Sequence, residues 1–483
     1  MRNVTRRSWM KTGAAVAAAA PAIQGTPAVT QTQASSPDYL QASKEAARWI
    51  TASAQATSHG GHWLVEPDHP ERAVAPPEQL GLYSGNAGVV LFLLQLAKAT
   101  GDSTYLEQAK SGADFLASHW KEVADAKPDG PLRSPFSFYS GLSGIAFSLT
   151  ETWKATGDVR FRDAALDVNE YFVKSAKPAK GGVTWTNTPA LGAGDTGILL
   201  YLLYAASAFQ DDSYRKLAVQ AGDNILSMAQ EDKRGGLRWI GVPAASLPGV
   251  PKDTYFPNFE LGTAGVAYGL ARLYNETLHS EPKAARFLDA AKQGALHLQR
   301  IATVKGDSAL VFYREPDKTD LYYLGFCHGP SGTGRLFYEL YKVTSDREYL
   351  EWTERLARGI TASGIPERLT PGFWYVVCQC CGSAGVTEFF LGLWAATHKT
   401  QYLTFAKRVA DQMLSRVTDF DDKGDRWYQA WTRVTPWVVN AETGYMIGAA
   451  GVGTALLHLH LAERQRYEAI LLPDNPFPRS TQA

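Results

Sequence analysis

The sequence predicts an all-α protein, an α/α toroid in which seven inner and seven outer helices form a double ring. Three observations predict it: a repeated glycine-pair element, an apolar helix after each pair, and an amphipathic helix after most of the apolar ones. The chain has 483 residues, 45% hydrophobic and 20% charged, which is ample for one large core. We therefore expect a single toroid domain over residues 36–483, behind a signal segment at residues 1–35.

A Gly-x-x-Gly element occurs seven times in the sequence. Successive first glycines lie 56, 53, 68, 67, 53 and 66 residues apart. Repetition at such a period indicates stacked supersecondary units. The first glycines of the seven elements are Gly85, Gly141, Gly194, Gly262, Gly329, Gly382 and Gly448.

Each glycine pair opens an apolar run, such as residues 89–96 or 198–203. A helix that is apolar on nearly every side must be buried all round. Glycine in the first turn also allows neighbouring backbones to approach closely. The seven helix starts should therefore crowd towards a common centre.

The partner helices begin with an Asp-x-x-aromatic signature at Asp102, Asp158 and Asp211, and Asp346 and Lys399 begin looser copies. Aspartate is a preferred N-cap, because its carboxylate accepts hydrogen bonds from free first-turn amides. The helices that follow, for example residues 103–120 and 159–174, are amphipathic and predict an outer layer.

The two ends of the repeat array complete each other. An amphipathic helix at about 38–54 precedes the first glycine pair, and the last inner helix, at about 452–463, has no partner helix after it. This match predicts a closed ring, which hides the apolar faces that an open solenoid must cap. An open superhelix of helical hairpins is the alternative.

The N-terminus carries the pattern of an export signal. Arg6 and Arg7 precede Lys11 and an Ala/Val-rich stretch, which is too short for a membrane anchor. We expect export through the twin-arginine pathway to the periplasm or the extracellular space. An amphipathic or disordered tail is the alternative.

The charge balance and hydropathy exclude two classes of partner. Lysine plus arginine equals aspartate plus glutamate, at 48 each, so the chain lacks the positive field that nucleic acid binding needs. No apolar run reaches the roughly 20 residues needed to span a bilayer, so we expect no integral membrane segment in the mature chain. We also expect a monomer.

The long loops between outer and inner helices carry tryptophans near glycines. Either these side chains fill the spaces between repeats, or some of them form platforms at the mouth of a cavity. The five are Trp63, Trp185, Trp239, Trp374 and Trp427.

All four cysteines lie just before the fifth or sixth glycine pair. Cys327 belongs to Gly-Phe-Cys-His-Gly, and Cys378, Cys380 and Cys381 belong to Cys-Gln-Cys-Cys-Gly. In a ring these segments meet at neighbouring helix N-termini, which favour the metal-binding thiolate form. Sulfur ligands at a four-coordinate site indicate zinc, Zn²⁺. Disulfides, expected in an exported protein, and unpaired buried thiols are the alternatives.

Here the sequence resembles the lanthionine synthetase C-like (LanC-like) family, from residue 38 to the final helix. The resemblance rests on seven glycine-pair helices with Cys-His-Gly-x-x-Gly in repeat five and Cys-x-Gly-x-x-Gly in repeat six. It implies an α/α toroid with a zinc site of two cysteines and a histidine; cyclase members add a peptide cysteine to dehydroalanine or dehydrobutyrine. Cys327 and Cys380 match the cysteine ligands, and Cys381 replaces the histidine.

The chain departs from the family pattern in two ways. The site has three cysteines, and its fourth position is open to water or a substrate thiol. If Cys378 filled that position instead, the site would be closed and structural. The family's histidine before the fourth glycine pair is Leu261 here. His328, Asp195 and Glu260 are candidates to move protons in its place, or they only stabilise the site and the helix starts.

Three functions follow as alternatives. The first is zinc-dependent activation of a thiol, on a peptide or a small molecule, for addition to an unsaturated peptide. The second is a non-catalytic member that binds metal or peptide. The third is a carbohydrate-active toroid, a glycosidase or an epimerase, with Asp195 and either Glu260 or Glu388 as acid and base. Export favours the second and third, and clustered cysteines oppose the third.

Overall fold

The computed structural model describes residues 38–127, 134–242, 246–247, 250–316 and 319–480. The chain from Asp38 onward forms one compact unit. The signal segment predicted at residues 1–35 lies outside the described residues.

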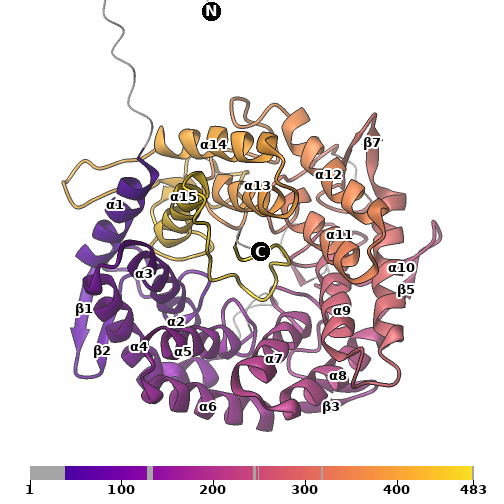
Figure 1. Cartoon of the computed structure of the whole chain (residues 1–483), viewed down its shortest axis with the longest axis horizontal. Coiled ribbons are helices and arrows are strands. Elements are labelled where there is room, and N and C mark those ends of the chain that lie inside the picture. Colours follow the sequence, from indigo (N-terminus) through magenta and orange to yellow (C-terminus); the bar gives the residue numbers. More distant parts are fainter. Residues whose placement is uncertain (1–37, 128–133, 243–245, 248–249, 317–318, 481–483) are drawn as a thin grey trace, which may run out of the picture. The chain divides into compact units, whose positions relative to one another are not determined.

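Seven apolar helices form the inner ring (Figure 1). Each has 15 residues and begins directly after the first glycine of a pair, which is the N-cap residue with an extended backbone. They are α3 (Asn86–Thr100), α5 (Leu142–Thr156), α7 (Asp195–Phe209), α9 (Thr263–Thr277), α11 (Pro330–Thr344), α13 (Ser383–Thr397) and α15 (Ala449–Glu463).

The second glycine of each pair lies in the first helical turn, where the backbone of the preceding loop is close. At Gly265 a Cβ atom would lie 1.9 Å from the carbonyl oxygen of Phe259. No side chain fits at that distance, so the glycine is required by contact with the chain itself.

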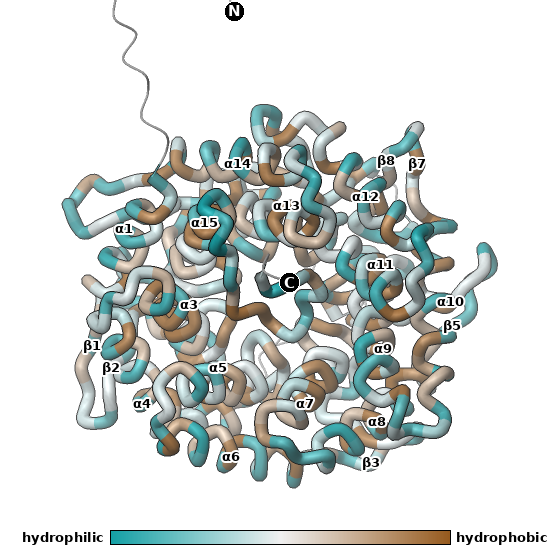
Figure 2. The backbone as a smooth tube through the Cα atoms, in the orientation of Figure 1, coloured by the Kyte–Doolittle hydropathy of each residue, from teal (hydrophilic) through white to brown (hydrophobic). Residues whose placement is uncertain are grey.

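Seven amphipathic helices form the outer ring, and each packs mainly on one inner helix. Figure 2 shows that they alternate hydrophilic and hydrophobic residues along the rim. They are α1 (Tyr39–Ala52), α4 (Ser103–Ala124), α6 (Val159–Lys174), α8 (Asp212–Ser227), α10 (Ala285–Ile301), α12 (Arg347–Ala362) and α14 (Thr400–Leu414).

The predicted aspartate caps are present. The carboxylates of Asp102, Asp158, Asp211 and Asp346 each accept a hydrogen bond from a first-turn amide, and Asp38 caps α1 in the same way. The helices α10 and α14 begin without a side-chain cap.

The ring is closed. The helix α15 packs on α1, α3 and α13, so the last repeat is completed by the first helix of the chain. The toroid prediction is therefore confirmed, and the open superhelix is wrong. None of the described helices is both long and apolar enough to cross a lipid bilayer.

Short elements occupy the loops. The helix α2 (Pro76–Leu80) precedes the first inner helix. Five antiparallel strand pairs in the described chain are β1 (Ala54–Thr57) with β2 (Gly60–Trp63), β3 (Lys177–Ala179) with β4 (Gly182–Thr184), β5 (Gln230–Glu231) with β6 (Leu237–Arg238), β7 (Thr303–Lys305) with β8 (Ser308–Leu310), and β9 (Gln429–Ala430) with β10 (Val439–Asn440).

The loop tryptophans fill the spaces between helices. All five predicted side chains are buried. The indole N–H groups of Trp185, Trp239 and Trp427 donate to carbonyl oxygens near the ends of α6, α8 and α14. These residues therefore anchor each loop to the preceding outer helix, and they do not form platforms at a cavity mouth.

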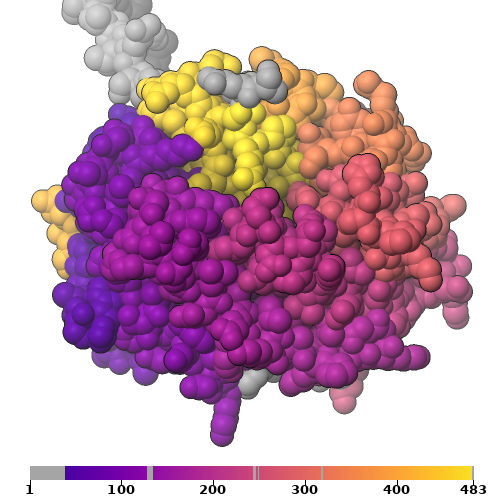
Figure 3. All heavy atoms as spheres, turned by 60° about the horizontal axis from the view of Figure 1, so that its bottom comes forward, coloured from indigo at the N-terminus to yellow at the C-terminus, as the bar shows by residue number. Residues whose placement is uncertain are grey.

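The segment after α15 enters the centre of the ring, which the sequence did not indicate (Figure 1). Asp474 accepts hydrogen bonds from Tyr139 and, at 3.0 Å, from Arg335. The ring of Phe477 stacks on Tyr338 of α11, with centroids 4.6 Å apart. Figure 3 shows the C-terminal part of the chain, in yellow, seated between the N-terminal part, in indigo and purple, and the part in orange.

Candidate metal centre

Equivalent residues of neighbouring repeats are joined by main-chain hydrogen bonds. They lie two positions before each first glycine: Tyr83, Tyr139, Gly192, Glu260, Cys327, Cys380 and Met446. The N–H of one donates to the C=O of the next at 2.8–3.1 Å, in the pairs 83→139, 446→83, 380→446, 327→380, 260→327 and 192→260. This chain of bonds sets the side chains of adjacent repeats beside one another.

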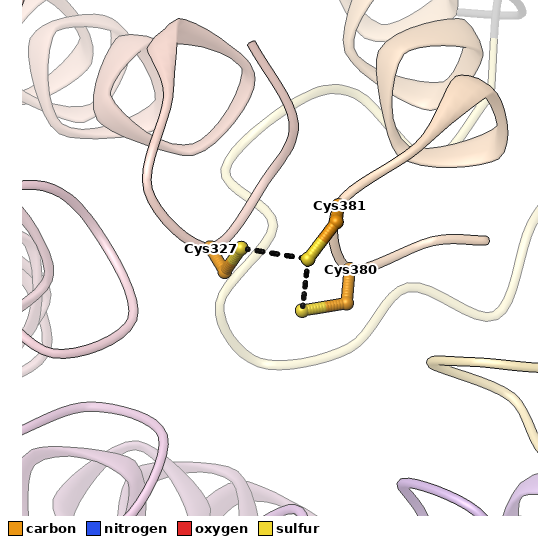
Figure 4. Close-up of side chains that lie close together, drawn as sticks. All are labelled: Cys327, Cys380 and Cys381. Atoms are coloured by element: carbon orange, nitrogen blue, oxygen red, sulfur yellow. Dashed lines mark hydrogen bonds between the residues drawn. The ribbon is translucent and has the colours of Figure 1, made fainter. Parts of the chain in front are cut away.

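Three cysteine sulfur atoms converge where Cys327 and Cys380 occupy two of these positions, and the third belongs to Cys381, which follows Cys380 (Figure 4). The Sγ atom of Cys381 lies 3.3 Å from that of Cys327 and 3.6 Å from that of Cys380. All three sulfur atoms lie within 4.8 Å of one another. None of the four cysteines forms a disulfide in the structure.

The spacing and chemistry of this donor set fit zinc. With Zn–S distances near 2.3 Å, two sulfur ligands of a tetrahedral site are about 3.8 Å apart. The two closest sulfur pairs here, at 3.3 and 3.6 Å, need to move by only a few tenths of an ångström. Cys327, Cys380 and Cys381 would hold the ion.

The three thiols act as one titrating group. Hydrogen bonds from the thiols of Cys327 and Cys381 hold the pKa of Cys380 well below its usual value. Burial raises the pKa of Cys327, and the hydrogen bond to Cys327 is the main cause that raises the pKa of Cys381. The cluster therefore favours one thiolate, and a bound cation would favour further deprotonation.

Cys378 lies beside this group of three, and its thiol is hydrogen-bonded to that of Cys381. Its sulfur accepts a hydrogen bond from the backbone N–H of Cys381 at 3.4 Å, and its own N–H donates to Gln429. These contacts fix the main chain that carries Cys381. They give Cys378 a supporting position beside the three-sulfur cluster.

Glu260 reaches the cluster from the fourth repeat. Its Oε2 atom lies 3.9 Å from Cys380 Sγ, and burial followed by the charge of Cys380 raises its pKa well above the usual value. Glu260 and Cys381 are the partly exposed members of the site, whereas Cys327 and Cys380 are buried. Solvent therefore reaches the site on this side.

His328 is enclosed by aromatic rings. Its imidazole lies 5.2 Å from the ring of Phe256 and 4.9 Å from that of Tyr313, centroid to centroid. Burial lowers its pKa to about 4, so the ring is neutral at neutral pH. Among the residues that the structure describes, its Nδ1 atom has no hydrogen-bond partner.

The other predicted carboxylates have different surroundings. Asp195 is fully buried and accepts hydrogen bonds from Thr184, Trp185 and Thr186, so it fixes the loop after β4. Glu388 is paired with His458 at 2.8 Å. Neither carboxylate belongs to the sulfur cluster.

One residue of the site was not anticipated. Tyr83 forms a hydrogen bond with the sulfur of Cys380, and its ring meets Trp431 edge to face at 6.1 Å. Its position two residues before a first glycine, like those of Cys327 and Cys380, is the signal that would have identified it.

Comparisons with known proteins agree with the fold and the repeat pattern. The family described as lanthionine synthetase C-like protein matches residues 76–240, 132–366 and 327–472. Among solved structures, nisin cyclase shares 16% sequence identity, with 82% of this chain and 91% of that chain covered and a TM-score of 0.57.

Two sugar-active toroids are more distant. A GH76 α-mannanase from Bacteroides thetaiotaomicron shares 15% identity, with 89% of this chain and 97% of that chain covered and a TM-score of 0.47. A sugar epimerase from a ruminal bacterium shares 10% sequence identity, with 87% of this chain and 98% of that chain covered and a TM-score of 0.45. These two similarities carry no functional argument. Because the family match extends over most of the sequence, the chain belongs to the lanthionine synthetase C-like family.

Proposed function

We propose that this protein holds zinc at Cys327, Cys380 and Cys381 and activates a thiol for addition to an unsaturated peptide, which forms a thioether. The observation that carries the proposal is the convergence of three sulfur atoms from two neighbouring repeats. Bound zinc would supply a Lewis acid that keeps a thiol in its nucleophilic thiolate form at neutral pH. Nisin cyclase has the same fold, which is consistent with a peptide substrate.

The chain's own residues define how a substrate would be received. Cys381 and Glu260 face the accessible side, where a peptide or small thiol could enter. Tyr83 donates a hydrogen bond to Cys380 and orients its sulfur. The aromatic rings of Phe256 and Tyr313 pack around His328, the residue that follows Cys327.

A second candidate is a member that binds metal or peptide without turnover. It is favoured by Leu261, which stands where the resemblance implies a histidine and packs in an apolar cluster with Ala190, Val242 and Phe256. No proton can be transferred at that side chain. The sugar-active alternative lacks such support, because Asp195 and Glu388 are each held by other contacts.

We further propose that the protein is exported through the twin-arginine pathway with its metal already bound. Support comes from the sequence of residues 1–35. Fusion of this segment to a reporter should direct the reporter outside the cytoplasm, and replacing Arg6 and Arg7 by lysine should abolish the export. Export of the doubly substituted fusion would contradict the proposal.

Turnover tests the catalytic proposal. The zinc-loaded protein is incubated with a dehydrated peptide and a small thiol, and mass spectrometry follows thioether formation. The wild type and Cys378→Ser should give product, whereas Cys380→Ser should not. Full zinc loading without product would reject catalysis of this reaction and favour the non-catalytic candidate.

A further inference from the structure

The fourth repeat contributes a carboxylate at the position where the fifth and sixth contribute cysteines. Glu260, Cys327 and Cys380 each lie two residues before a first glycine. The N–H of Glu260 donates to the C=O of Cys327 at 2.8 Å, and the N–H of Cys327 donates to the C=O of Cys380 at 3.1 Å. Three consecutive repeats therefore present potential ligands from one structural position.

The carboxylate lies within reach of an ion held by the sulfurs. Its Oε2 atom is 3.9 Å from Cys380 Sγ, and Glu260 and Cys327 have donor atoms within 4.8 Å of each other. In a tetrahedral zinc site an oxygen and a sulfur ligand are about 3.5 Å apart. The observed separation needs only a small side-chain adjustment.

The third repeat leaves space for this side chain. The residue equivalent to Glu260 in that repeat is Gly192, whose N–H donates to the C=O of Glu260 at 2.8 Å. A Cβ atom on Gly192 would lie 2.5 Å from Glu260 Cγ and 2.9 Å from Oε1. Any larger residue would displace the carboxylate from the sulfur cluster.

The surroundings of Glu260 lack a compensating positive charge. Among the residues that the structure describes, no lysine or arginine pairs with it, and its nearest polar neighbours include a cysteine sulfur. A carboxylate that is only partly exposed has lost part of its hydration, and a cation or a set of hydrogen bonds stabilises it in place of that water. A metal ion at the three sulfurs would provide that charge.

We propose that Glu260 is the fourth protein ligand of the metal centre, which makes the site Cys₃Glu; this inference rests on the metal site of the proposed function. Of the four ligands the carboxylate is the hard one, and zinc accepts the softer thiolate in its place. A substrate thiolate would therefore replace Glu260 and leave the three cysteines bound. The site is closed at rest and opens at one position.

Cobalt substitution tests the ligand set without requiring turnover. The Co²⁺ forms of wild type, Glu260→Ala, Glu260→Gln and the control Glu442→Gln are compared by absorption spectroscopy. In both Glu260 variants the d–d bands should shift, while the sulfur-to-cobalt charge-transfer intensity stays that of three thiolates. The control should match the wild type, because nothing in the described structure places Glu442 at the sulfurs.

Titration with 2-mercaptoethanol gives a second readout. A fourth thiolate should raise the charge-transfer intensity by about one third in every form. The Glu260→Ala protein should reach half of this rise at a thiol concentration at least about 10-fold below that of the wild type, because no carboxylate has to leave. The Gln variant serves if the Ala variant does not fold.

Identical spectra and thiol titrations for wild type and the Glu260 variants would overturn the inference. A shift produced by His328→Ala, with none in the Glu260 variants, would overturn it in favour of the histidine. Thioether formation by wild type with unchanged Glu260 spectra would reject the ligand and retain the proposed function. A spectral shift in the Glu260 variants without thioether formation by the wild type would support Glu260 as a ligand and reject the proposed catalytic function.

Discussion

The C-terminal segment in the centre of the ring should contribute strongly to stability through Asp474. This side chain is 1% exposed, and Arg335, whose Nη1 lies 3.0 Å from Asp474 Oδ1, is 6% exposed. Removal of one partner of a buried ion pair leaves the other charge uncompensated, which costs about 3–5 kcal/mol. Asp474→Ala should therefore lower the free energy of unfolding by that amount.

A matched control lies on the same segment. Glu468 pairs with Lys98, but both side chains are more than half exposed, so Glu468→Ala should cost less than about 1 kcal/mol. Urea unfolding at pH 7 measures both variants, and limited proteolysis should release the segment from Asp474→Ala alone. Equal, small effects of the two substitutions would refute the placement of this segment in the ring.

Three further predictions concern other parts of the molecule. Burial, followed by the charges of Glu66 and Glu78, raises the pKa of Glu442 from 4.5 to about 8. The free energy of unfolding of the wild type should therefore fall as the pH rises from 4.5 to 8, and Glu442→Gln should flatten this decline. Urea unfolding at a series of pH values measures it, and parallel pH curves for the two proteins would contradict the prediction. Gly265→Ala should lower stability by about 1–3 kcal/mol, since the new Cβ meets the Phe259 carbonyl, and an unchanged urea midpoint would contradict this contact. Tyr83→Phe should lower zinc affinity about 10-fold in chelator competition, because Cys380 loses a hydrogen bond. The control Tyr139→Phe should leave zinc affinity unchanged, because the Tyr139 hydroxyl donates to Asp474 and not to a cysteine. Equal affinities for wild type and Tyr83→Phe would reject this role of Tyr83.

The ring itself was predictable from the sequence because its determinants are local. Each first glycine precedes an inner helix, and an aspartate such as Asp102 caps an outer helix through its own first turn. Such signals repeat along the chain and need no knowledge of distant contacts. The same repetition predicted that the two cysteine segments adjoin.

The features that the sequence did not predict depend on contacts between residues that are far apart in the chain. Asp474 and Phe477 belong to a segment without helical periodicity, and its position in the ring is determined by residues of α11 such as Arg335. Likewise, the relation of Glu260 to Gly192 appears only when the repeats are placed side by side. Asp195 looked like a candidate acid at a helix start, yet its hydrogen bonds hold a neighbouring loop.

X-ray absorption at the zinc edge of the purified protein measures the number and type of ligands directly. We expect one zinc per chain with about three sulfur atoms near 2.3 Å and one oxygen near 2.0 Å. Four sulfur atoms would make Cys378 a ligand and the centre structural. Protein that binds no zinc under native purification would contradict the metal centre altogether.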